Sequence, residues 1–388
     1  MILTIFVVFL LYIIAVFFWK FPAVSNNKLN VYKECGSILN RIFFYLVPVS
    51  LISLIIGLRY DVGVDYLAYK EIYETRFVGG FNESLENIEF LYAVISFCCY
   101  KFGMPYYLLF VIMAFIPFYF YYKSFHCFRY LFPYATYFLI SLGILFWYLN
   151  IQRQAIAFFI LLYSVNYIIK KRLFFFLLCC LIAAGFHVTS FYFIPCFLFY
   201  YFPQRQLLSS NFLVFVYTLT WLFSSYLQHF LFEMITPFLS GRYATYLEIM
   251  NEWEMEGGSG IGLIILHLVD IILILNSSIL FYKYRQERFD IYFRIYFVGT
   301  IIANIAGVNM VLSRLPFCFT SMKIIVASFF VCYVLSIWRY NSFLKRKFSL
   351  VLLVVFTVLL LGANITNTLY CFVFQQCYVY IDSTERSC

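Results

Sequence analysis

Charged residues are scarce in this chain of 388 residues. They make up 12% of the sequence, against 64% hydrophobic residues, and the mean hydropathy is +0.89. Such a shortage of charge excludes an ordinary soluble protein and is typical of a chain that crosses a membrane repeatedly. We therefore expect an all-α polytopic membrane protein: one integral membrane domain over residues 1–388, with no soluble domain.

The sequence also lacks the features of nucleic-acid-binding and metal-binding proteins. The formal net charge is +9, but the cations lie in short clusters between apolar runs. No basic stripe or nucleic-acid motif is present, so no nucleic-acid partner is expected. Three of the four histidines, His126, His229 and His267, show no metal-ligand spacing. We expect no cofactor and no metal, although Asp61 and Asp65 leave a metal site possible.

The clusters of lysine and arginine predict the topology. The segment from Ile2 to Trp19 has no basic residue before it and no small-residue cleavage site after it, so we expect an anchor and not a signal peptide. The basic loop that follows is then cytoplasmic, and residues 59–89 form an acidic outer loop. Later basic clusters stay cytoplasmic only if Phe90–Phe102 is a short membrane-dipping helix and Pro105–Tyr122 a true span.

The resulting map has about twelve transmembrane helices plus the short helix, with both termini outside. The predicted spans cover residues 2–19, 42–58, 105–122, 131–149, 154–169, a hairpin of two over 173–202, 212–232, 261–282, 295–312, 317–338 and 349–363.

The hairpin from Leu173 to Phe202 is short for two crossings. Two helical arms of about fifteen residues would rise about 22 Å each, whereas the hydrocarbon core is about 30 Å thick. Its tip, residues 185–190, is therefore predicted to lie below the outer surface at the floor of a recess. His187 in this tip is either a satisfied core histidine or a general base, because an ionisable group at that depth usually has a task.

Polar residues on the outer side form a candidate site. The stretch Gly57–Tyr73 leaves the membrane after the second predicted span and carries an arginine, two aspartates and several tyrosines. Four arginines stand at outer span ends or in outer loops: Arg59, Arg153, Arg242 and Arg314. A guanidinium offers a planar donor fork to phosphate oxygens, so four on one face suit a diphosphate. Each arginine could instead only snorkel to lipid phosphate.

Two further features have two readings each. Asp65 either caps the helix that begins near Tyr66 or serves as a base. Asp270 and Lys323 lie inside predicted spans, where they either pair with each other or belong to a proton path.

Several motifs resemble those of a known family. Gly57-Leu58-Arg59-Tyr60, followed by Gly63-Val64-Asp65-Tyr66 and Tyr69, resembles the signature of EpsG-like proteins, the Wzy-type polymerases of bacterial surface polysaccharides. Gln152-Arg153-Gln154-Ala155, Phe186-His187-Val188-Thr189-Ser190 and Arg314 keep the family's order. The likeness covers roughly Ile42 to Trp338. Val64 stands where the family commonly has threonine, and the tail after Ala363 has no recognised counterpart.

The resemblance implies a membrane glycosyltransferase that joins undecaprenyl-diphosphate-linked repeat units into O-antigen, capsule or exopolysaccharide. The enzyme would be a multi-pass protein of the bacterial cytoplasmic membrane, with its site facing outside. Partners would be the lipid-linked oligosaccharide and membrane lipids, with a chain-length regulator and a flippase as further candidates. The outer loops 59–89 and 233–260 would line the site. The expected catalytic residues are His187 and Asp65; the expected substrate-binding residues are Arg59, Arg153, Gln154, Arg242, Tyr246 and Arg314.

Two other classes remain open from the residues alone. A transporter or flippase of lipid-linked sugars would bind the same ligand without chemistry; such proteins often contain internal repeats, and none is found in this sequence. A membrane O-acyltransferase would also use an intramembrane histidine, but its polar site would open to the cytoplasm.

Overall fold

The computed structural model describes residues 46–63, 65–75, 77, 88–126, 128–235, 261–306 and 314–340, and all regular structure in these ranges is helical. The chain forms two compact units, an N-terminal unit (Met1–Phe202) and a C-terminal unit (Pro203–Cys388). The predicted spans at 2–19 and 349–363 lie outside the described residues. The prediction of an all-α protein is confirmed for the described part of the chain.

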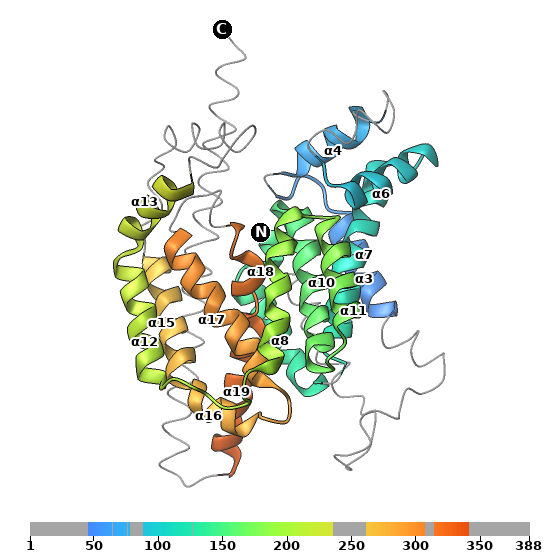
Figure 1. Cartoon of the computed structure of the whole chain (residues 1–388). Coiled ribbons are helices and arrows are strands. Elements are labelled where there is room, and N and C mark those ends of the chain that lie inside the picture. Colours follow the sequence, from blue (N-terminus) through green and yellow to red (C-terminus); the bar gives the residue numbers. More distant parts are fainter. Residues whose placement is uncertain are drawn as a thin grey trace. The chain divides into compact units, whose positions relative to one another are not determined.

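The N-terminal unit is a bundle with two short helices at one end. Figure 1 shows α4 and α6 beyond the same end of the bundle that contains α3, α7, α10 and α11. The elements are α3 (Val47–Gly57), α4 (Tyr66–Thr75), α6 (Phe90–Lys101), α7 (Tyr106–Ser124), η2 (Arg129–Leu131), α8 (Phe132–Ser141), α9 (Ile144–Asn150), α10 (Gln152–Ile169), α11 (Leu173–Ala184) and η3 (Val188–Tyr201).

Helix α10 forms the core of this unit. It packs against α7, α11 and η3, and every side chain from Ala155 to Leu162 is at most 1% exposed. A helix that is apolar on all sides is stable only when other helices surround it. On the other side of α7, Gly57 brings α3 close, because a Cβ at this position would lie 2.4 Å from the Cα of Val111. Gly57, which ends α3, and Gln152, which begins α10, are thus held in place by the packed bundle.

Three helices of the described chain are long and apolar enough to cross a membrane. They are Tyr106–Ser124, Phe289–Ala306 and Phe317–Ile337, and a fourth span results if Gly262–Leu275 and Ser277–Lys283, bent by 48°, are taken together. The protein is therefore a helical membrane protein, and the count of about twelve spans stays a prediction. The separation of the short helix α6 from the true span α7, expected from charge, is confirmed.

Three predicted continuous spans are broken, among them residues 261–282, which bend by 48° between Leu275 and Ser277. Residues 131–149 divide into α8 and α9 at Gly143, which takes a left-handed φ of 73° that ends the helical ladder. Residues 212–232 divide into α12 (Ser210–Leu222) and α13 (Ser224–Ile235). The Phe223 N–H still donates to the Leu219 carbonyl at 3.0 Å, and the next helix begins at Ser224.

The short hairpin is present, but its arms differ. The first arm is the α-helix α11, whereas the second, η3, is a 3-10 helix of 14 residues with Pro195 inside it. At about 2.0 Å per residue this arm extends about 28 Å, and α11 about 18 Å at 1.5 Å per residue. The assumption of two equal α-helical arms was wrong, so the submerged position of the tip stays a prediction.

The C-terminal unit contains α12 and α13 followed by α15 (Ile261–Leu275), α16 (Ser277–Lys283), α17 (Phe289–Ala306), α18 (Phe317–Thr320) and α19 (Lys323–Tyr340). Helix α12 packs against α15 and α17, which lie beside it in Figure 1. Gly299 lets α17 approach α18, because a Cβ there would lie 2.5 Å from the Cβ of Phe319. The predicted outer loop covers residues 233–260. Its residues 236–260 lie outside the described residues.

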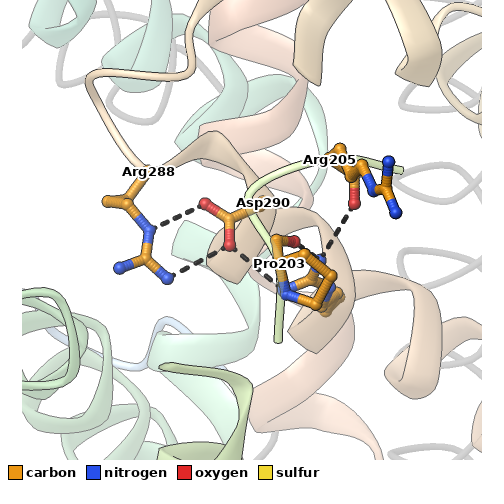
Figure 2. Close-up of polar contacts among 5 residues, drawn as sticks. Pro203, Arg205, Arg288 and Asp290 are labelled. Atoms are coloured by element: carbon orange, nitrogen blue, oxygen red, sulfur yellow. Dashed lines mark hydrogen bonds and ion pairs between the residues drawn. The ribbon is translucent and has the colours of Figure 1, made fainter. Parts of the chain in front are cut away.

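A buried acid organises the other end of α17. Figure 2 shows Asp290 accepting two bonds from Arg288, at 2.9 and 3.2 Å. Arg294 also bonds to Asp290 (3.1 Å) and donates to the carbonyls of Pro203 (2.5 Å) and Arg205 (3.3 Å). One carboxylate therefore binds two guanidinium groups, and Arg294 links it to the chain that enters α12. This arginine cluster is structural and serves the fold.

Candidate functional site

Arg59 holds the loop that follows α3. Its guanidinium donates to the carbonyls of Ile56 (3.1 Å), Val62 (3.0 Å) and Leu149 (3.4 Å), and the residue is 6% exposed. Its Cζ lies 5.7 Å from the centroid of the Tyr66 ring and 5.6 Å from that of Phe110. Burial lowers the pKa of Arg59, but arginine remains charged in proteins.

These contacts give Arg59 a positioning role in this structure. Three of its bonds go to backbone oxygens, so the fork fixes the loop geometry. That Arg59 also binds a diphosphate stays a prediction.

Gly63 brings the loop after α3 against the residues that precede α10. Its φ is 107°, and a Cβ would lie 2.5 Å from the carbonyl oxygen of Leu149 and 3.0 Å from Asn150 Oδ1. Only glycine accepts both this backbone conformation and this contact. The loop is thereby pressed onto the junction between α9 and α10, where Gln152-Arg153-Gln154 begins.

Arg153 stands in the first turn of α10 and pairs with Glu89. Its NH1 group contacts Glu89 Oε2, and the side chains are 28% and 21% exposed. Glu89 precedes α6, so the ion pair joins the starts of two helices. The phenol of Tyr69 lies beside the Arg153 guanidinium, and burial raises the pKa of Tyr69, which keeps that hydroxyl protonated. An arginine, an acid and a phenol therefore meet in a partly accessible place.

The hairpin tip meets the same turn of α6. The N–H of Leu91 donates to the carbonyl of Gly185 at 2.8 Å, and a Cβ on Gly185 would lie 2.5 Å from Leu91 Cγ. Gly185 is two residues before His187, and Leu91 is two residues after Glu89. The motif 186–190 at the hairpin tip is thus connected, through α6, to the motif 152–155 that begins α10. The structure brings together three stretches that are far apart in the sequence.

His187 caps the start of η3. Its Nδ1 accepts a bond from the Thr189 N–H (3.4 Å) and lies 2.9 Å from Thr189 Oγ1. In the neutral ring an Nδ1 that accepts requires the proton on Nε2. The lone pair that a base would use then faces Thr189, so this geometry suits a hydrogen-bond donor at Nε2 better than a base.

Asp65 lies just before α4, and its backbone carbonyl accepts from the Tyr69 N–H at 3.0 Å. It is half-buried and belongs to the loop that Arg59 and Gly63 fix. The structure thus places Asp65 within the same end of the unit as Arg153. Whether its carboxylate acts as a base stays a prediction.

Sequence reasoning missed several polar groups at this end. In the sequence Glu89 is only one of several loop acids, whereas in the fold it is the partner of Arg153. Gln152 is fully buried, donates to the Tyr148 hydroxyl at 3.0 Å, and its Oε1 has no hydrogen-bond partner among the described residues. The Tyr92 hydroxyl and Ser190 Oγ are also buried and have no hydrogen-bond partner among the described residues. Buried polar atoms of this kind usually mark a place where water or a polar ligand binds. The sign available in the sequence was that the amide side chain of Gln152 stands next to Arg153.

Four further residues were predicted to bind substrate: Gln154, Arg314, Arg242 and Tyr246. Gln154 is 1% exposed on α10, so it faces the protein interior. Arg314 is half-buried before α18, in the C-terminal unit. Arg242 and Tyr246 lie outside the described residues. Substrate binding by these four residues stays a prediction.

A second polar network lies inside the C-terminal unit. Lys323 Nζ is 2.6 Å from Asp270 Oδ1, which confirms the expected pairing. The same carboxylate accepts from the hydroxyls of Tyr296 (2.5 Å) and Tyr217 (3.1 Å). His267 joins this network, because its Nδ1 lies 2.6 Å from the Tyr217 hydroxyl. A proton path through these groups stays a prediction.

The apolar helices and the polar end of the N-terminal unit define a helical membrane protein with a candidate site at one end of a bundle. The sequence model of the EpsG family matches residues 42–383, so the chain belongs to the EpsG family. It is a membrane protein of polysaccharide biosynthesis, of the polysaccharide polymerase type. The match includes most of the tail after Ala363, which carried no recognised motif. No curated protein and no solved structure matches the chain significantly.

Proposed function

We propose that this protein polymerises oligosaccharide repeat units carried on undecaprenyl diphosphate, at the outer face of the bacterial cytoplasmic membrane. The observation that carries the proposal is the meeting of three motifs at one end of the N-terminal unit. Gly63 contacts Leu149, Arg153 pairs with Glu89, and Gly185 is bonded to Leu91. Motifs with no packing need for one another converge on a polar place, as expected of a site for an anionic, hydroxyl-rich ligand.

The reaction is a glycosyl transfer. The acceptor hydroxyl oxygen forms a bond to the anomeric carbon of the growing chain. The bond from that carbon to the diphosphate oxygen breaks, and its electron pair leaves with the lipid diphosphate. The hydroxyl proton passes to a base. The main electrostatic need is therefore a cation that stabilises the departing diphosphate.

Arg153 is our candidate for that cation, because its guanidinium is partly accessible whereas that of Arg59 is bonded to backbone carbonyls. Arg59 and Gly63 hold the loop that carries Asp65. We assign Asp65 as the base, since the Nδ1 lone pair of His187 faces Thr189. His187 would then donate from Nε2 to a sugar or phosphate oxygen. Arg314, Arg242 and Tyr246 would contribute further binding groups.

Deletion of the gene in its native host tests the proposed function. Loss of a polymerase leaves single repeat units on their anchor, which run as one short band when surface glycan is separated on a gel. Restoring the gene should restore a ladder of longer chains. If deletion removes all repeat units from the surface, the protein is a flippase. If chain length is unchanged and only acyl groups are lost, it is an O-acyltransferase.

A further inference from the structure

Tyr69 lies on the buried face of α4. The buried residues of this helix are Tyr66, Tyr69 and Tyr73, which recur every three or four positions and therefore share one face. Tyr69 is 7% exposed, and its ring centroid lies 5.9 Å from that of Tyr92. The ring of a phenylalanine would pack in the same way, so packing does not account for the hydroxyl group of Tyr69.

The phenol oxygen of Tyr69 is bonded to Arg153 twice. It accepts one hydrogen bond from the guanidinium and one from the backbone N–H of the same residue. Arg153 is the second residue of α10, where backbone N–H groups have no carbonyl partner within the helix, and Ile151 before the helix supplies no side-chain cap. One oxygen atom therefore fixes both the backbone and the charged end of Arg153.

A phenol suits this task because it is neutral. Burial raises the pKa of Tyr69, so the hydroxyl stays protonated and leaves the charge of Arg153 uncancelled. A guanidinium has five N–H donors, so the bonds to Glu89 and to the phenol do not exhaust it. The Arg153 side chain is also 28% exposed, which leaves it within reach of a ligand.

A guanidinium that is held in place binds a ligand better than a mobile one. An arginine side chain has several rotatable bonds, and it loses rotamer entropy when its planar fork binds phosphate oxygens. A side chain that the protein already holds loses less of this entropy on binding. The hydroxyl of Tyr69 therefore increases the affinity of Arg153 for an anion without touching the anion itself.

We propose that Tyr69 is a positioning residue of the candidate site: its phenol holds the Arg153 guanidinium in the orientation that binds the lipid diphosphate. This inference rests on the proposed function, because it takes Arg153 as the ligand of the diphosphate. Tyr69 acts only through Arg153, so its hydroxyl affects binding only while Arg153 is present.

The test measures the affinity of the full-length protein, in nanodiscs of zwitterionic lipid, for a short isoprenoid diphosphate. Tyr69→Phe removes the hydroxyl and keeps the ring, and we expect about tenfold weaker binding. Tyr73→Phe is the matched control, because Tyr73 lies one turn later on the same face, is 4% exposed and donates to the Met104 carbonyl at 2.6 Å. This control should lower the thermal midpoint without changing the affinity.

A double-mutant cycle separates positioning from a general structural effect. Arg153→Ala should bind the probe weakly, and adding Tyr69→Phe should weaken it no further. An equal weakening by Tyr69→Phe in the presence and absence of Arg153 would overturn the proposal. Wild-type affinity of Tyr69→Phe would also overturn it.

Failure of the proposed function gives a different result. If Arg153→Ala binds the probe as tightly as the wild type does, Arg153 is not the diphosphate ligand, and that part of the proposed function fails together with the role of Tyr69. Should Tyr69→Phe fold poorly, Tyr69→fluorotyrosine keeps the ring and the hydroxyl and weakens only the oxygen as an acceptor. It should lose less affinity, again only while Arg153 is present, and an unchanged affinity would overturn the proposal.

Discussion

Lys323 at the start of α19 and Asp270 within α15 form an ion pair, with Nζ 2.6 Å from Oδ1. Tyr217 and Tyr296 add hydrogen bonds to the same carboxylate from α12 and α17. A buried pair of opposite charges contributes little net stability, but removal of one partner leaves an uncompensated charge. The pair therefore constrains four helices of the C-terminal unit.

The first prediction follows from this pair. Lys323→Met should lower the free energy of unfolding by about 3–5 kcal/mol, because Asp270 loses its counter-ion. The thermal midpoint of the purified protein in detergent measures the effect. The double variant Lys323→Met with Asp270→Asn should recover much of the loss, and Lys170→Met, at an exposed position, should be neutral. A double variant no more stable than Lys323→Met would show that the charges do not act as a pair.

The second prediction concerns Gly63. Gly63→Ala should disturb the junction of α9 and α10 and reduce polymerisation, because the new Cβ would lie 2.5 Å from the Leu149 carbonyl oxygen. Gly103 is a matched control: its φ is also positive, at 67°, but no atom lies within 4 Å of the position that a Cβ would take there. Both alanines take a positive φ, which strains an L-residue, but only the alanine at position 63 adds the close contact. Equal effects of the two variants would contradict the proposed docking of the loop.

A third prediction separates Arg59 from Arg153. Lysine keeps the charge but loses the planar fork. Arg59→Lys should lower protein level and thermal stability, since three backbone carbonyls lose their donor. Arg153→Lys should leave the protein level normal and lower the polymerisation rate. Full activity of Arg153→Lys at matched membrane abundance would reduce this arginine to an ion-pair partner of Glu89.

The fourth prediction compares the two candidate bases. Asp65→Asn should lower the rate of polymerisation by about a hundred- to ten-thousand-fold, the usual cost of removing a general base. His187→Gln should cost less, because its Nδ1 is bonded to Thr189 and not placed to accept a proton from the acceptor. Rates are compared at matched membrane abundance. A larger loss in His187→Gln than in Asp65→Asn would reverse the assignment.

Part of this picture was predictable from the sequence. Charge alternation was sufficient to separate the short helix α6 from the span α7, because thirteen apolar residues before a glycine are too few for a bilayer. The breaks at Gly143 and Phe223 were not predicted: the first depends on a backbone conformation, and the second lies within an apolar run. Apolar composition does not distinguish a bent pair of helices from a straight span.

The candidate site, too, was predictable from the sequence only in part. The motifs contain Gly63 and Arg153, and the predicted hairpin tip begins at Gly185. Their contacts with Leu149, Glu89 and Leu91 could not be deduced, since each joins residues that are distant in sequence. The sequence also did not show that Arg59 donates to backbone carbonyls, one of which, that of Leu149, only the fold brings near.

The most direct test of the central claim is a reconstituted reaction. The purified protein is incorporated into vesicles with its lipid-diphosphate-linked repeat unit, and the products are resolved by length while released lipid diphosphate is measured. The proposed function predicts chains that grow in steps of one repeat unit, with one lipid diphosphate released per bond formed, and growth slowed by about a hundred-fold or more with Asp65→Asn. Repeat units that cross the vesicle membrane without elongation or release of lipid diphosphate would contradict it.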